Sequence, residues 1–181
     1  MTFQAAIMFP GDLSDAAARF SADASVAASA DAAASGLAAL PGAWAQAVGM
    51  GWPAMLVPEA QGGAGGSLAD LGAVIEAAAR QALALPLVRR CAQAPWLLQA
   101  LGAPAASTLR ALCIGALDID VADGMALTVA PRDGGGVRLA GGIQALDLAV
   151  PASHRLAVAA GHVLLIADGL LPAPSARHVG I

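Results

Sequence analysis

The chain has 181 residues, enough for one domain or for two small domains that share a core. Hydrophobic residues make up 58% of it, charged residues only 12%, and the formal net charge is −4. The 9 basic residues form no cluster, so nucleic acid is not expected as a partner, because neutralising phosphates requires grouped Lys or Arg.

The mean hydropathy of +0.70 raises the question of a membrane span. The longest run without charge, residues 32–58, is long enough on count alone. Three prolines and four glycines interrupt it, however, so short helices joined by turns are expected and no membrane span. The first residues lack the basic region of a signal peptide, which favours a cytoplasmic protein. The absence of Lys, Asn and Tyr is typical of a GC-rich bacterial genome.

Helical spacing dominates the first part of the chain. Residues 12–34 and 43–49 are expected to form helices, and residues 92–101 another, with Pro95 in its first turn. Ser67 is predicted to cap the clearest helix, which Pro86 ends, with Asp70 as the partner in a capping box. Glu76 and Arg80 lie one turn apart and are expected to pair. The predicted apolar face of this helix comprises Leu68, Leu71, Ile75, Ala78, Ala79 and Ala82.

Short apolar runs between turn residues dominate the second part. A hairpin connection is expected at residues 132–136 and a second turn at residues 168–169. We therefore predict an α+β protein, with an N-terminal all-α domain at residues 1–110 and a small antiparallel β domain at residues 111–181. The predicted strands are 112–117, 125–130, 137–140, 143–149, 155–159 and 163–167.

The glycine cluster at residues 62–66 could hold a phosphate or could only turn the chain into a helix. A Walker A loop needs a lysine, and this chain has none. A dinucleotide fingerprint starting at Gly63 needs a third glycine where Leu68 stands. The sequence therefore favours a turn that delivers Ser67 as a helix cap.

Groups for acid–base, metal or nucleophilic chemistry are scarce. The only glutamates are Glu59 and Glu76, both in the helical part. Three aspartates at positions 118, 120 and 123 could bind a cation, but solvated turn aspartates are commoner. Ser153 and His154 are adjacent, and neighbours on a strand point to opposite faces, so they are a poor nucleophile–base pair. Neither the two cysteines nor the three histidines have metal-site spacing, so no metal site is expected.

Residues 49–88 read GMGWPAMLVPEAQGGAGGSLADLGAVIEAAARQALALPLV and resemble the N-terminal helical domain of the acyl-CoA dehydrogenase family. The segments ALTVAPRDGGGVRLAGG and SHRLAVAA are similar to strands of that family's middle β domain. The residues that match the family pattern are Gly51, Trp52, Leu56, Val57, Pro58, Glu59, Gly62, Gly63, Gly65, Ser67, Asp70 and Arg80.

The resemblance implies an FAD enzyme that removes hydrogens from Cα and Cβ of an acyl-CoA thioester. A carboxylate base takes the α proton, and the flavin takes the β hydrogen as hydride. An electron-transfer flavoprotein then reoxidises the flavin, as in fatty acid or steroid degradation. The family segment that helps to hold FAD and substrate falls near Gly115 to Asp123, and Leu117 and Asp118 are its candidate cofactor-binding residues. The segment that packs against the flavin falls at Ala145, Leu146 and Asp147.

The sequence departs from the family at these segments. The Gly-Ser of the first segment is absent, and the second has no aromatic or hydroxyl residue. The family's C-terminal helical domain, which supplies the catalytic glutamate, is also absent from the sequence, and neither Glu59 nor Glu76 can replace that base. No catalytic residue is therefore assigned.

Three interpretations stay open: a degenerate chain that pairs with another dehydrogenase chain, a fragment of a dehydrogenase, and a non-enzymatic structural or acyl-binding remnant. In each, a β domain without its helical neighbour exposes an apolar face, so a homo- or hetero-oligomer is expected.

Overall fold

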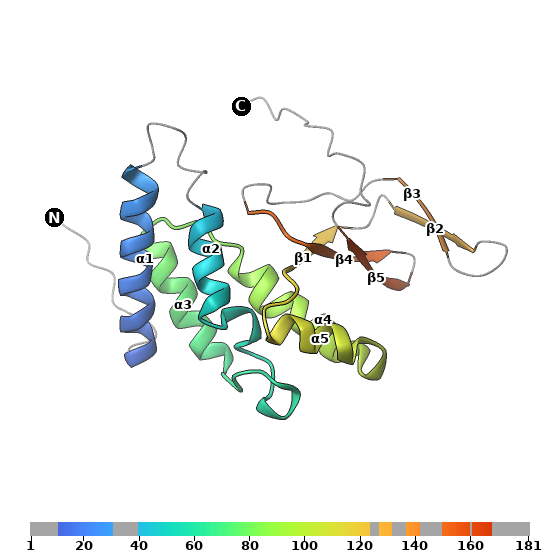
Figure 1. The fold of residues 1–181 in the computed structure, drawn as a ribbon, viewed down its shortest axis with the longest axis horizontal. Helices are drawn as coiled ribbons and strands as arrows, with labels where there is room; N and C mark the ends of the chain where they lie inside the picture. The colour runs from blue at the N-terminus through green and yellow to red at the C-terminus, as the bar shows by residue number, and fades with distance from the viewer. Residues whose placement is uncertain are drawn as a thin grey trace. The chain divides into compact units, whose positions relative to one another are not determined.

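A computed structural model describes residues 11–30, 40–123, 127–131, 137–141, 150–159 and 161–167. Contacts divide the chain into two compact units. The helical unit comprises Met1–Leu117 with Ala149–Pro151, and the β unit comprises Asp118–Leu148 with Ala152–Ile181. Figure 1 shows helices in the first unit and strands in the second. The α+β fold class is thus confirmed, while the domain boundary expected at residue 110 stays a prediction.

The helical unit is built from five α-helices and several single turns among its described residues. The α-helices are α1 (Asp12–Ala30), α2 (Leu40–Gly49), α3 (Leu68–Arg80), α4 (Ala94–Leu101) and α5 (Ala106–Cys113). The short 3₁₀ turns are η2 (Trp52–Ala54), η3 (Glu59–Gln61) and η5 (Ala103–Ala105). A π-helical turn, η4 (Val88–Gln93), runs directly into α4. All four expected helices are found among the described residues as α1, α2, α3 and α4, with bounds that differ by a few residues.

Large side chains from α2, η2 and α3 form the core of the helical unit. Trp44, Trp52, Leu71 and Val74 are all buried in one apolar cluster. The ring of Phe20 from α1 meets Trp52 edge-on, with 4.8 Å between the ring centroids. Such aromatic contacts add to the free energy gained by burying apolar surface. α1 packs along α3 (Figure 1), so the core is closed on that side by a helix distant in sequence.

The buried face of α3 differs in part from the predicted one. Leu71 and Ala78 are buried as expected, but Leu68 is 75% exposed and Ala79 is exposed as well. The helix ends at Arg80, before Pro86, because Ala82 takes a positive φ of 52° that no helix can continue. The buried positions are Leu71, Ala73, Val74, Ala77 and Ala78.

The described residues of the β unit form two small sheets. The strands are β1 (Ile119–Asp123), β2 (Leu127–Pro131), β3 (Val137–Gly141), β4 (His154–Ala159) and β5 (His162–Ala167). β2 and β3 pair antiparallel, as do β4 and β5. β1 pairs with β4 in parallel, which the sequence did not indicate. The pairing of Pro131 with Val137 fits a hairpin across residues 132–136, which themselves lie outside the described residues.

One predicted strand is wrong. Residues 112–117 complete α5 and the turn after it, and the strand begins at Ile119. The apolar run here covers the last residues of a helix and the turn after it, and the pattern of so short a run cannot distinguish this from a strand. The strand expected at residues 143–149 and the turn at residues 168–169 lie outside the described residues. Among the described residues, no helix is both long and apolar enough to span a bilayer.

Candidate functional site

The glycine cluster forms a closed turn and offers no phosphate cradle. The amide of Gly63 donates to Pro58 O, that of Gly65 to Val57 O at 2.8 Å, and that of Gly66 to Met55 O at 2.8 Å. A phosphate site needs such N–H groups to point outward at the anion. Gly63 is required for packing, because a Cβ there would lie 2.2 Å from Val57 O. The prediction of a turn into the helix is confirmed.

Ser67 caps α3 as the sequence predicts. Its hydroxyl accepts from the Asp70 amide at 3.2 Å, and the Asp70 carboxylate accepts from the Ser67 amide at 2.7 Å. The backbone and hydroxyl bonds from Ser67 lower the pKa of the Asp70 carboxyl, the backbone bond having the larger effect. The pair therefore stabilises a helix start and is not available as an acid–base pair.

The segment that the family resemblance assigns to FAD binding begins in the turn after α5. In the helical unit, the amides of Ala116 and Leu117 both donate to Ala111 O, at 2.9 and 3.2 Å. The Gly115 amide donates to Leu112 O at 3.0 Å. Gly115 has a φ of +70°, which allows the chain to reverse at the end of the helix. The N–H groups of this turn are therefore directed at the helix that it follows.

Asp118 starts the β unit and is held there through its backbone. Its amide donates to Ser153 Oγ at 3.0 Å, and its carbonyl accepts from Ser153 Oγ at 2.9 Å. The amides of Ser153 and His154 donate to the same carbonyl, both at 3.0 Å. Asp118 and Ser153 are 35 residues apart, and the parallel pairing of β1 with β4 brings them together. We call this set of hydrogen bonds the Ser153 clasp.

The donors at Leu117 and Asp118 do not fit FAD. The cofactor presents an anionic diphosphate and a ring rich in acceptors, so a protein must offer it N–H donors or positive charge. Both backbone amides here are already bonded within the protein, Leu117 has no polar side chain, and a carboxylate repels a diphosphate. Ala145, Leu146 and Asp147 lie outside the described residues. The cofactor assignment of all five residues stays a prediction, and the geometry at the first two does not favour it.

Ser153 and His154 are closer than the sequence suggests. His154 Nδ1 lies 3.0 Å from Ser153 Oγ. The expectation that they point apart is wrong, because Ser153 precedes β4 and does not alternate with its strand neighbours. The Ser153 hydroxyl is nevertheless committed to the Asp118 backbone, so the pair does not form an activated nucleophile.

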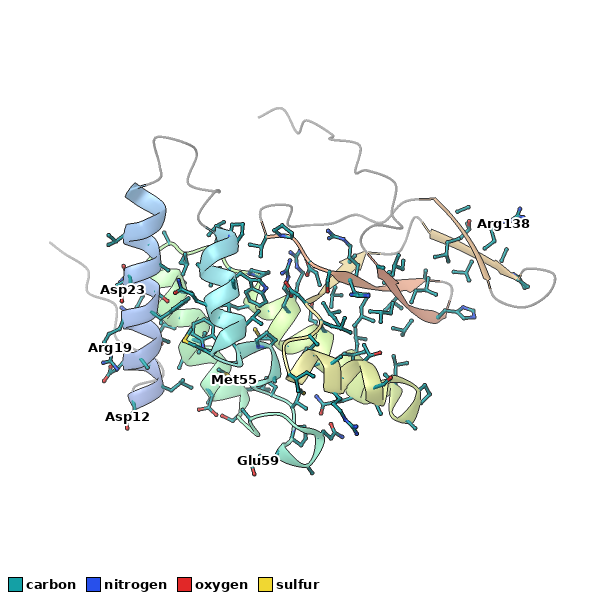
Figure 2. All side chains as sticks on the ribbon, viewed as in Figure 1. Asp12, Arg19, Asp23, Met55, Glu59 and Arg138 are labelled. Carbon is teal, nitrogen blue, oxygen red and sulfur yellow. The ribbon has the colours of Figure 1, made fainter. Side chains whose placement is uncertain are left out.

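Three further carboxylates lie in different surroundings. Glu76 accepts from Arg80 at 2.8 Å, which confirms the predicted pair. Glu59 points outward from its loop (Figure 2). Asp120 is buried in β1, opposite Arg155 of β4 in the register. Within the described parts of the chain, no three His, Cys, Asp or Glu side chains are grouped as metal ligands.

Sequence reasoning missed Arg90, which is 1% exposed within the helical unit. Its guanidinium donates to the carbonyls of Val150 and Pro151, and lies 5.1 Å from the centre of the Trp44 ring. The sequence feature that could have indicated this residue is the pair Arg89 and Arg90 in an otherwise apolar segment. Arg90 therefore joins α2, the π-helical turn and residues 150–151 into one packed region.

Cavities of ligand size occur among the described residues of the helical unit. One, of about 310 Å³, has an apolar floor at Leu98 and Leu109, with Gln99 and Arg110 at its polar edge. Another, of about 360 Å³, is lined by apolar residues such as Ile75, Leu85 and Val88. Both are at the small end of the range for ligand pockets. The first combines apolar surface with polar donors, the combination that an acyl group with a polar head requires.

Comparisons with known proteins identify the class to which this fold belongs. A family model described as "Acyl-CoA dehydrogenase, N-terminal domain" matches residues 12–106. The match spans more than half of the chain, and the chain belongs to the acyl-CoA dehydrogenase family. No curated protein matches the sequence.

A solved structure shares the fold over a larger part of the chain. It is a variant of the Tcur3481-Tcur3483 steroid ACAD, with a TM-score of 0.53 and 22% sequence identity. The match covers 86% of this chain and 48% of the other, so the sequence spans about half the length of that relative. At this identity the likeness supports the fold alone.

Proposed function

We propose that this chain is a degenerate subunit of an acyl-CoA dehydrogenase, which pairs with another chain of the family that holds the FAD. The complex would carry out α,β-dehydrogenation of an acyl-CoA thioester in bacterial fatty acid or steroid degradation, in the cytoplasm. An electron-transfer flavoprotein would accept the electrons. The observation that carries the proposal is the family match over residues 12–106.

The donors at the expected cofactor segment support a degenerate role. The backbone amides of Leu117 and Asp118 are both bonded within the protein and are not available to a flavin. No reaction step is therefore assigned to these two residues. Its own glutamates do not serve as the base either, because Glu76 is bonded to Arg80 and Glu59 points outward from its loop. The chain would instead contribute an interface to the complex with its partner chain.

Exposed apolar side chains in the helical unit support association with another chain. Trp96 is 66% exposed, Ile114 74% and Leu68 75%. Large apolar groups on the surface of a chain with few charges favour burial in an interface. An oligomer is therefore expected in solution.

Co-purification tests this proposal. The full chain is expressed with the dehydrogenase-like product of a neighbouring gene, and the eluted species is weighed by light scattering. Co-elution as a complex with a flavin absorption band is the expected result. A monomer that binds no dehydrogenase chain would contradict the proposal.

The alternative is a non-enzymatic remnant that binds acyl groups, and the cavity beside Leu98 and Arg110 is the observation that favours it. Titration with an acyl-CoA, followed by calorimetry, would then show binding to the full chain alone. The Ala106→Phe variant fills that cavity and should abolish the binding heat, whereas binding that survives the substitution would exclude the cavity.

A further inference from the structure

The hydroxyl of Ser153 has used its full hydrogen-bonding capacity. A serine hydroxyl has one donor and two acceptor positions. Its hydrogen goes to Asp118 O at 2.9 Å, and one lone pair accepts from the Asp118 amide at 3.0 Å. His154 Nδ1, 3.0 Å away, must therefore donate to the second lone pair. The contact is therefore made by a form of His154 that carries a proton on Nδ1.

The same contacts remove the Asp118 peptide from reach of a ligand. Its N–H donates to Ser153, and its carbonyl receives Ser153 Oγ together with the amides of Ser153 and His154. A ligand that needs the Asp118 amide must first break a bond that the protein already makes. No replacement donor is present at this residue, because its side chain is a carboxylate.

We infer that the Ser153 clasp closes the Asp118 position to flavin, so that the chain by itself does not bind FAD. This inference rests on the proposed function, since it explains why the chain needs a partner that holds the cofactor. Ser153 is the closing residue, and His154 supports it by donating from Nδ1.

Amide hydrogen exchange tests the clasp without any cofactor. In the unsubstituted full chain, the Asp118 amide should exchange slowly, and in Ser153→Ala it should exchange roughly tenfold faster or more. Ser153→Thr keeps the hydroxyl and should preserve the protection. Ser25→Ala is the matched control, because it removes a different side-chain bond, to Gln81 O, in the helical unit. Rapid exchange at Asp118 in the unsubstituted chain would show an open donor and overturn the inference.

Titration of the full chain with FAD tests the consequence. Flavin fluorescence should remain unquenched, while a cooperative thermal transition shows that the chain is folded. Binding of FAD to the chain alone would overturn the inference.

The two proposals fail in different ways. Absence of a dehydrogenase partner in the co-purification would contradict the proposed function but leave the exchange and titration results unchanged. FAD binding to the isolated chain would overturn the inference about the Ser153 clasp. Co-elution with a dehydrogenase partner would still support the proposed function in that case.

Discussion

At the scale of single residues, Ser67 and Asp70 show how a short pattern becomes a defined contact. The two residues exchange hydrogen bonds and begin α3, as expected from their spacing. Ser67→Ala should lower the free energy of unfolding by about 1 kcal/mol, the usual cost of losing an N-cap. Chemical denaturation measures this change. Ser107→Ala, at an exposed position of a helix, is the control and should change the free energy of unfolding by roughly a few tenths of a kcal/mol at most.

The same pair makes a prediction about pH. The bonds from Ser67 lower the pKa of Asp70 in the folded protein, below the value of about 3.9 for an unfolded aspartate. Its stabilising contribution is therefore complete above that pH and is lost as the pH falls through the folded pKa. NMR titration should show the pKa of Asp70 rising toward the unfolded value in Ser67→Ala. An unchanged pKa would mean that the hydroxyl has no electrostatic effect on the carboxyl.

At the scale of elements, the loop before α3 depends on a glycine that touches backbone. A Cβ at Gly63 would overlap Val57 O and Val57 Cβ, whereas one at Gly42 in α2 would meet nothing within 4 Å. Gly63→Ala should destabilise the protein by roughly 1–3 kcal/mol or more through overpacking. Gly42→Ala should stabilise it by roughly 0.5–1 kcal/mol, because alanine favours a helix. Thermal unfolding compares the two, and equal effects would contradict the close approach.

The parallel pairing of β1 with β4 makes a prediction about charge. The register places Asp120, 1% exposed, beside Arg155, 7% exposed. Opposite charges on adjacent strands stabilise each other more strongly when buried. Asp120→Ala and Arg155→Ala should each destabilise the protein, and a double-mutant cycle should give a coupling of at least roughly 0.5 kcal/mol. Additive effects would show that the two side chains do not interact.

At the scale of the whole molecule, Arg90 joins parts of the helical unit that are far apart in sequence. Arg90→Met would leave the carbonyls of Val150 and Pro151 without a donor and remove the contact with Trp44. The free energy of unfolding should fall by roughly 2–4 kcal/mol, because a hydrogen bond to a charged group contributes about 1.5–3 kcal/mol. Arg110→Met, at an exposed position, should change stability by less than about 0.5 kcal/mol. Similar losses in both variants would contradict a special role for Arg90.

The sequence by itself determined the features that depend on neighbours along the chain. The cap at Ser67 and the Glu76–Arg80 pair join residues three and four positions apart, and the observed bonds match them. The strands β2 and β3 follow each other along the chain and pair as expected, and the family pattern agrees with the family match. Local spacing is enough here because helix and turn geometry fixes which near neighbours meet.

Only the tertiary structure decided the rest. Residues 112–117 have an apolar pattern that suits a strand or a helix, and packing selected the helix end. The parallel pairing of β1 brought Ser153 to Asp118 from 35 residues away, and burial placed Arg90 against residues 150–151. No spacing within one segment encodes such meetings, because they follow from how distant elements fold against each other.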